Sequence, residues 1–253
     1  MIAARRIVAW ASVAAIACVA GCVAPPAAMG AGPGDAPERA SFEVLASREP
    51  APGAMLGAED CEPLAARRER WATVAVPGEA TKPAAAVEVT YEQDGERVVR
   101  RDAAGTRVLV RTAEGSVALA EQTDASDGST VRFTPPLLLA PARLAAGDRP
   151  AADSQADTSK AGAADRDPGR AQRSIHLAAA ERVRTPLGEF EALRVDATFT
   201  MKVPFASMRR ETSTWVVPGR GPVATRSDER ILVMGIVPRN RAETRVLIPG
   251  DAP

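Results

Sequence analysis

Apolar side chains recur at every second position along much of the chain. The longest such segment, 193–203, carries its apolar residues at alternate positions: Leu193, Val195, Ala197, Phe199, Met201 and Val203. A period of two is typical of a β-strand with one buried and one solvated face. Val87, Val89 and Tyr91 follow the same pattern, and Asp94-Gly95 after them favours a hairpin turn.

Short runs of this kind extend from about Leu64 to Ile248 and are separated by turn residues. They predict one all-β, mainly antiparallel domain over 63–249. Only the stretch PLAARRERW at 63–71 suggests a short helix, and it is equally compatible with an approach to the first strand. We therefore expect at most one or two short helices in the whole domain.

One region inside this domain lacks the pattern. Residues 147–173 contain no large apolar side chain, and such a composition cannot offset the entropy that is lost when a chain is ordered. We expect a disordered loop there; a linker between two domains is the alternative. We favour the loop because the flanking segments, 131–144 and 175–203, are each too small to form a separate core.

The first 21 residues have the plan of an export signal, in which Arg5 and Arg6 precede an apolar run that ends in small residues. The run closes on VAGC at 19–22, which resembles the lipobox of bacterial lipoproteins. This resemblance implies cleavage before Cys22 and a diacylglyceryl thioether on its sulfur. An ordinary secretory signal is the alternative.

The lipobox also implies that the protein is anchored in the bacterial cell envelope, because two or three acyl chains hold a protein on a membrane almost permanently. Residues 22–62 are expected to form a lipidated, disordered tether, since they are rich in Pro, Ala and Gly and show no sustained period. By analogy with sorted lipoproteins, Val23 in place of Asp favours the outer membrane, facing the periplasm.

Cys61 is expected to be the one free thiol of the mature protein, since Cys18 leaves with the signal and Cys22 carries the lipid. The neighbouring Asp60 and Glu62 should raise the pKa of this thiol. A reactive cysteine needs the opposite environment. An incidental cysteine is therefore favoured over a redox or intermolecular role.

The charge balance excludes some partners. The chain has 32 basic and 32 acidic residues, and loss of the two signal arginines leaves a net charge of about −2. Such a balance argues against nucleic-acid binding and against a polybasic membrane patch.

No group of residues has the spacing of an active site. His176 is the only histidine and alternates with apolar neighbours on a predicted strand, which excludes a histidine-rich metal site. GRGPVA at 219–224 matches a dinucleotide-binding pattern, but it lies between two strand-like runs and not before a helix. Glu189 and Glu191 lie at a turn, with nothing to bring them together as an acid-base pair. We expect no enzymatic activity, no metal and no cofactor.

Two segments resemble a pattern found in exported bacterial proteins of unknown function: VRTPLGEFEALRV at 183–195 and TSTWVVPGRGPV at 212–223. FTPPLLLAPARLAAGD at 133–148 is similar to the proline-leucine segment that precedes them in those proteins. Their fold is similar to that of the periplasmic lipoprotein carriers LolA and LolB. The resemblance implies a sheet curled into an unclosed β-barrel over an apolar cavity, and it implies no particular activity.

The apolar face of such a half-barrel has to be covered by the chain itself, a ligand or a partner, because burial of each large side chain contributes about 1.5–3 kcal/mol. The residues expected to line the cavity are Phe133, Leu193, Val195, Phe199, Met201 and Trp215. Two functions remain open. One is binding of a lipid or other apolar ligand, and the other is a non-enzymatic structural role in which the outer surface contacts an envelope protein.

Overall fold

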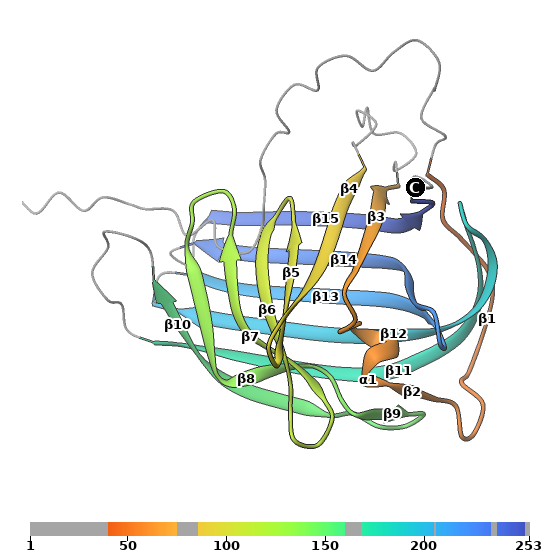
Figure 1. Ribbon diagram of the computed structural model, residues 1–253, viewed down its shortest axis with the longest axis horizontal. Coiled ribbons are helices and arrows are strands. Elements are labelled where there is room, and N and C mark those ends of the chain that lie inside the picture. Colours follow the sequence, from red (N-terminus) through yellow and green to blue (C-terminus); the bar gives the residue numbers. More distant parts are fainter. Residues whose placement is uncertain (1–39, 75–85, 160–167, 205, 234–236, 251–253) are drawn as a thin grey trace, which may run out of the picture.

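The computed structural model describes residues 40–74, 86–159, 168–204, 206–233 and 237–250 (Figure 1). Its elements, in chain order, are β1 (Glu43–Arg48), β2 (Met55–Gly57), α1 (Ala58–Cys61), β3 (Arg67–Thr73), β4 (Val87–Asp94), β5 (Arg97–Asp102), β6 (Gly105–Arg111), β7 (Val117–Asp124), β8 (Thr130–Ala140), β9 (Arg143–Ala145), β10 (Ala151–Ser159), β11 (Gly169–Thr185), β12 (Gly188–Val203), β13 (Ala206–Val217), β14 (Gly221–Val233) and β15 (Val237–Ile248). The all-β, antiparallel class predicted from the sequence is confirmed.

Twelve of these strands form a closed antiparallel barrel. The ring runs β11-β10-β8-β7-β6-β5-β4-β3-β15-β14-β13-β12 and returns to β11. The β11–β12 ladder that closes it extends from the Arg170–Lys202 pair to the Thr185–Gly188 pair. The prediction of an unclosed barrel is therefore wrong, because β11 pairs along one edge with β12 and along the other with β10. Closure satisfies backbone groups that an open sheet leaves at its edges.

The expected loop over 147–173 is also wrong where the structure describes it, because β10 and the start of β11 lie there. β10 and the first residues of β11 contain no large apolar side chain, and small ones face the interior instead: Ala156 and Ala171 have no exposed surface. A Cβ on Gly169 would lie 2.6 Å from Cγ1 of Val203, so this position has no room for a side chain. Large neighbours such as Phe133 and Phe199 supply the apolar volume instead.

Part of the expected tether is ordered, too. β1 pairs with the far half of β11, β2 pairs with β9, and α1 follows β2 directly. Asp60 in α1 accepts hydrogen bonds from the amides of Gly57 (2.9 Å) and Gly219 (2.8 Å), which ties the helix to the β13–β14 turn. This helix precedes the 63–71 stretch, for which a short helix and an approach to the first strand were both open, and β3 occupies most of that stretch. Residues 1–39, with the predicted signal and Cys22, lie outside the described residues.

The barrel is flattened into two walls. Figure 1 shows β4 to β7 standing nearly upright and β11 to β15 running nearly horizontally, so the strands of the two walls cross steeply, as in orthogonally packed sheets. The largest buried cluster fills the space between them and includes Val89, Leu109, Phe133, Phe199 and Met201. A second cluster joins Leu56 of β2 and Leu144 of β9 to Val195 and other residues of β11 and β12.

A third cluster lies on the outer face of the barrel. β11 carries an irregularity between Leu177, which pairs with Val195, and Ala179, which pairs with Arg194. The extra residue turns the side chains that follow it to the opposite face of the sheet. Val183 of β11 consequently packs outside with Trp215, and Phe42 covers them, its ring centroid 4.5 Å from that of Trp215.

Candidate ligand site inside the barrel

The barrel interior contains a small cavity of about 50 Å³. Its apolar lining consists of Leu119, Val131, Phe133, Leu137, Leu139, Phe199 and Met201. Its polar lining consists of Arg107, Gln122, Arg173 and Arg210. The cavity therefore combines an apolar wall with three guanidinium groups, which is unusual because arginine is almost never buried without a partner.

Strand register brings these arginines to the interior. Arg173 of β11 lies opposite Phe199 of β12, which lies opposite Arg210 of β13. On the other wall, Arg107 of β6 lies between Arg100 of β5 and Gln122 of β7. Directly opposed residues of neighbouring strands point to the same face. Each arginine thus shares its face with residues that line the cavity or the core.

Some of the interior arginines have partners. Arg210 forms an ion pair with Glu229, which lies opposite it on β14 and is buried. Arg100 lies 3.1 Å from a carboxylate oxygen of Asp102, and its guanidinium carbon lies 5.9 Å from the ring centroid of Tyr91. These contacts supply the opposite charge and the aromatic face that a buried guanidinium needs.

Arg107 and Arg173 differ from these neighbours. Within the described part of the chain, neither guanidinium has a hydrogen bond or an ion pair, and Nε of Arg173 is buried without an acceptor. Burial lowers the pKa of each side chain to about 10, so both remain protonated at neutral pH. Both residues keep some accessible surface, which fits groups that face an internal cavity.

Carboxylates compensate these two charges only from beyond ion-pair distance. Asp102 raises the pKa of Arg107 against the larger effects of burial and of the neighbouring Arg100. Glu62, which follows α1, raises the pKa of both Arg107 and Arg173. Neither carboxylate forms an ion pair with either guanidinium among the described residues. The cavity therefore keeps two protonated groups whose hydrogen-bond donors are not used by the fold.

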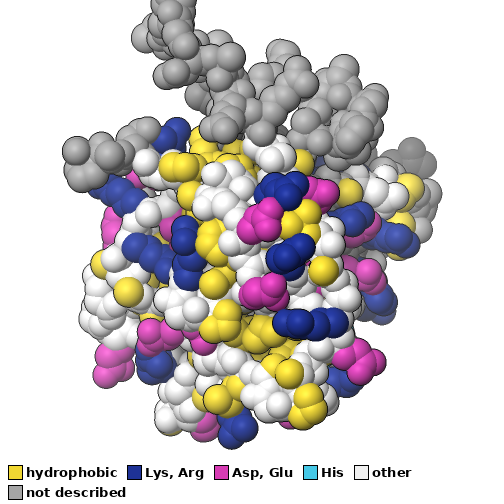
Figure 2. Space-filling model, turned by 90° about the vertical axis from the view of Figure 1, so that its right-hand side faces the viewer, with side chains coloured by type: hydrophobic (Ala, Val, Ile, Leu, Met, Phe, Trp, Pro, Cys, Tyr) yellow, Lys and Arg dark blue, Asp and Glu magenta, His cyan; other side chains and the backbone are white. Residues whose placement is uncertain are grey.

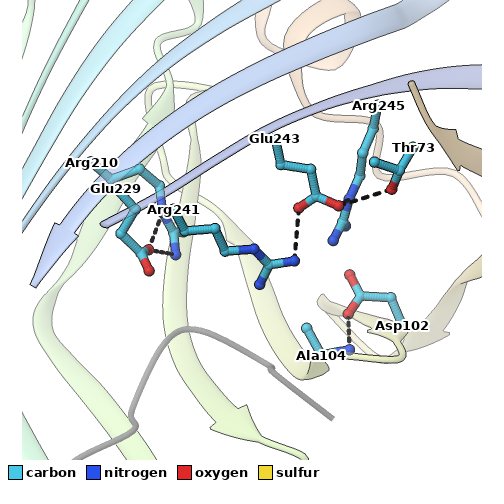
Figure 3. A network of polar contacts seen from close by, with 8 residues as sticks. All are labelled: Thr73, Asp102, Ala104, Arg210, Glu229, Arg241, Glu243 and Arg245. Carbon is cyan, nitrogen blue, oxygen red and sulfur yellow. Dashed lines mark hydrogen bonds and ion pairs between the residues drawn. The ribbon is translucent and has the colours of Figure 1, made fainter. Parts of the chain in front are cut away.

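A second group of polar side chains lies near the Arg210–Glu229 pair (Figure 3). Glu243 of β15 accepts hydrogen bonds from Thr73 (3.0 Å) and Arg245 (2.8 Å), and Arg241 approaches it to 3.1 Å. Burial raises the pKa of Asp102, but Arg100, Arg107 and the amide of Ala104 together outweigh it, so the net pKa is below its usual value. These carboxylates are engaged within the fold.

The structure separates the six residues expected to line a cavity. Phe133, Phe199 and Met201 line it. Val195 and Leu193 belong to the cluster beneath β2 and β9, where Leu193 is only partly buried. Trp215 lies on the opposite face of the sheet, because it pairs with Arg194 and not with Val195.

The three cavity arginines were not identified from the sequence. Arg107 lies in TRVLVRT. There the apolar Val108 and Val110 suggest that their own face of the strand is buried and that the face of Arg107 is exposed. Arg173 lies in the stretch that we expected to be a loop. The available signal was the alternation itself, since Arg107 and Leu109 share one face of β6 and Leu109 has no exposed surface.

Two other residues considered from the sequence have ordinary surroundings. The pKa of Cys61 is raised to about 12, first by burial and then by Asp60 and Glu62, so the expected direction is confirmed. His176 is half-buried opposite Asp196 of β12. Among the described residues, no group of three or more His, Cys, Asp or Glu side chains is placed to hold a metal ion.

No helix in the described ranges combines the length and hydrophobicity needed to cross a membrane. Comparison of the chain with protein-family models, with curated proteins and with solved structures found no match. The resemblance to lipoproteins therefore stays a prediction. The resemblance to exported half-barrel proteins also stays untested, but the unclosed barrel that it implied is wrong.

Proposed function

We propose that the chain is a non-enzymatic, lipid-anchored protein of the bacterial envelope whose barrel binds a small amphipathic ligand. The observation that carries the binding role is the internal cavity, where an apolar wall meets three guanidinium groups. Binding sites for small molecules are typically apolar with a few converging polar groups. The anchor rests on VAGC at 19–22, and the expected location is the outer membrane, facing the periplasm.

The size of the cavity limits the ligand. A volume of about 50 Å³ accommodates roughly one or two water molecules, since each takes about 30 Å³ in the liquid, and drug-sized ligands need about 300–1,000 Å³. A long acyl chain would require the two walls to move apart. The cavity suits a short apolar stem, or one end of a longer molecule.

Binding is tested on the chain expressed without residues 1–21 and with Cys22→Ala. We expect hexanoate or hexyl phosphate to bind saturably with one site per chain in isothermal titration calorimetry. Phe199→Asp places a charge in the apolar lining and should weaken binding by at least about tenfold, provided that circular dichroism shows an intact fold. An exposed position on the same strand, Lys202→Asp, serves as the control. Absence of saturable binding by hexanoate, hexyl phosphate and hexanol would overturn the binding role.

The lipid anchor is tested separately in the cell. Cys22→Ala should abolish incorporation of labelled fatty acid and release the protein from membranes, because the thioether is the attachment point in a lipoprotein. Cys61→Ala is the matched control, since it removes a different thiol and should leave labelling unchanged. Unchanged membrane retention of the Cys22 variant would contradict the anchor.

A role in binding an envelope protein has one observation in its favour. β1 pairs with β11 on one side and has no second neighbour among the described strands, so its other edge is available for strand addition. The surface gives it little further support. The exposed large apolar side chains of the described residues, Val44, Met55 and Leu232, lie on three different strands, and Figure 2 shows basic and acidic side chains interspersed on the face it presents.

A further inference from the structure

We infer that Arg107 and Arg173 bind the oxyanion head of the ligand, a carboxylate or a phosphate, inside the barrel. This inference rests on the proposed binding function and adds the chemical class of the group that the site recognises. Its basis is that two guanidinium groups line one cavity and form no ion pair with a described residue, and that Nε of Arg173 is also buried without an acceptor.

The fold leaves these two charges without direct compensation. Arg210 has Glu229 and Arg100 has Asp102, whereas Arg107 has no ion-pair partner in the described ranges and lies directly opposite Arg100. Like charges opposite one another on neighbouring strands are destabilising. A partly buried charge without a direct partner is also unfavourable, although Asp102 and Glu62 offset part of the cost. The protein therefore retains a positive charge in its interior at a cost in stability.

Both groups face the same space. Arg107 comes from β6 and Arg173 from β11, strands that are not neighbours in the ring, and both line the cavity. Gln122, opposite Arg107 on β7, adds a side-chain amide to the lining. Guanidinium groups bind carboxylate and phosphate oxygens through paired hydrogen bonds. An oxyanion in this cavity would supply acceptors and neutralise the local charge.

The rest of the lining favours a ligand with an apolar part. Seven of the eleven lining residues are apolar, including Phe133 and Phe199. An apolar surrounding strengthens an ion pair because it excludes water. It also favours an anion that carries a short apolar stem over a fully hydrated inorganic ion. Hexanoate and hexyl phosphate have this chemistry, and they differ only in the head group.

The test compares four probes on the Cys22→Ala chain by calorimetry at low ionic strength: hexanoate, hexyl phosphate, hexanol and inorganic phosphate. We expect one of the two anionic chains to bind at least about tenfold more tightly than hexanol, since a hydrogen bond to a charged group contributes about that factor. Arg107→Gln and Arg173→Gln should each weaken anion binding by about tenfold or more and leave hexanol unaffected.

Arg170→Gln is the matched control. Arg170 lies on β11 like Arg173, but its side chain is 72% exposed and pairs with Asp153. We expect this variant to bind within about twofold of the unchanged chain, because exposed ion pairs contribute little. The comparison of hexanoate and hexyl phosphate with hexanol on the chain that keeps all its arginines needs no further variant, and it tests oxyanion recognition even if a substitution prevents folding.

The outcomes separate this inference from the proposed function. If hexanol binds as tightly as both anions, the binding function stands and the oxyanion site is wrong. If phosphate binds through Arg107 and Arg173 but no chain-bearing probe does, the anion site stands and the amphipathic ligand is wrong. If no probe binds, both are wrong. The relative affinities of hexanoate and hexyl phosphate then identify the head group.

Discussion

Two groups of buried charge in this protein are built in opposite ways. On the outer face of the barrel, Glu181 of β11 is 2% exposed and accepts hydrogen bonds from Ser47 (2.8 Å), Arg194 (2.7 Å) and Trp215 (2.5 Å). Inside the barrel, Arg107 and Arg173 have no such partner among the described residues. One charge is fully satisfied by the fold, and the other two are not.

This difference in pairing suggests different roles for the two groups of charge. The partners of Glu181 come from β1, β12 and β13, so this carboxylate holds the first strand against the barrel wall. Buried polar groups in native proteins are nearly always paired. Two interior guanidinium groups without direct partners therefore indicate a role that the fold alone does not explain, and the bound anion that we propose would supply the missing acceptors.

The largest expected change in stability follows substitution of Glu181, the carboxylate whose hydrogen bonds are all made within the fold. Glu181→Ala should lower the free energy of unfolding by about 3 kcal/mol, because it leaves Arg194 and the indole N–H of Trp215 without their acceptor. Urea unfolding monitored by circular dichroism measures the change. Glu191→Ala, which removes an exposed carboxylate from β12, is the control and should change stability by less than about 0.5 kcal/mol. If Glu181→Ala lowers stability as little as Glu191→Ala does, the contacts of Glu181 do not stabilise the fold.

A smaller effect is expected at Trp215. Trp215→Phe removes the indole donor to Glu181 but keeps an aromatic ring against Phe42. The free energy of unfolding should fall by about 1–2 kcal/mol, which corresponds to one hydrogen bond to a charged group. Ligand affinity should not change, because Trp215 lies outside the cavity. Weaker hexanoate binding in this variant would place the ligand on the outer face.

Substitution of an arginine inside the barrel should change the free energy of unfolding in the opposite direction. Without ligand, Arg107→Met should raise the free energy of unfolding by about 1 kcal/mol, since it replaces a buried charge that has no direct partner with an apolar side chain. The same urea experiment measures this change. A loss of about 2 kcal/mol or more, approaching the scale of a broken buried ion pair, would mean that Arg107 has a structural partner.

The smallest expected effect on stability comes from the paired carboxylates inside the barrel, and this effect depends on pH. Burial raises the pKa of Asp102, but its arginine neighbours lower it further, so the pKa in the folded protein is below the ordinary value of 3.8. Stability from this group is therefore present above the ordinary pKa and is lost as pH falls through the lower, folded value. Asp102→Asn should make the fall in stability below pH 3.8 less steep in urea unfolding measured across this range. An unchanged slope would show that other carboxylates control acid unfolding.

Part of this organisation could be predicted from the sequence. The alternation of Leu193 to Val203 identifies a long strand, and its inner residues Phe199 and Met201 do line the cavity. Closure could not be predicted, because β10 faces the interior with small side chains such as Ala156, which give no apolar signal. The position of Trp215 depends on strand register, and the outward turn of Glu181 depends on an irregularity near Ala178; neither is encoded in hydrophobic alternation.

The most direct test of the central claim measures the unfolding free energy of the unchanged chain and of the Arg107→Gln, Arg173→Gln double variant, each with and without hexanoate or hexyl phosphate. We expect the double variant to be at least as stable as the unchanged chain without ligand. At a ligand concentration of about 100 times Kd, the unchanged chain should gain about 2.7 kcal/mol and the variant almost nothing. A variant that is much less stable without ligand, or that gains as much from the anion, would contradict the assignment of these arginines to binding.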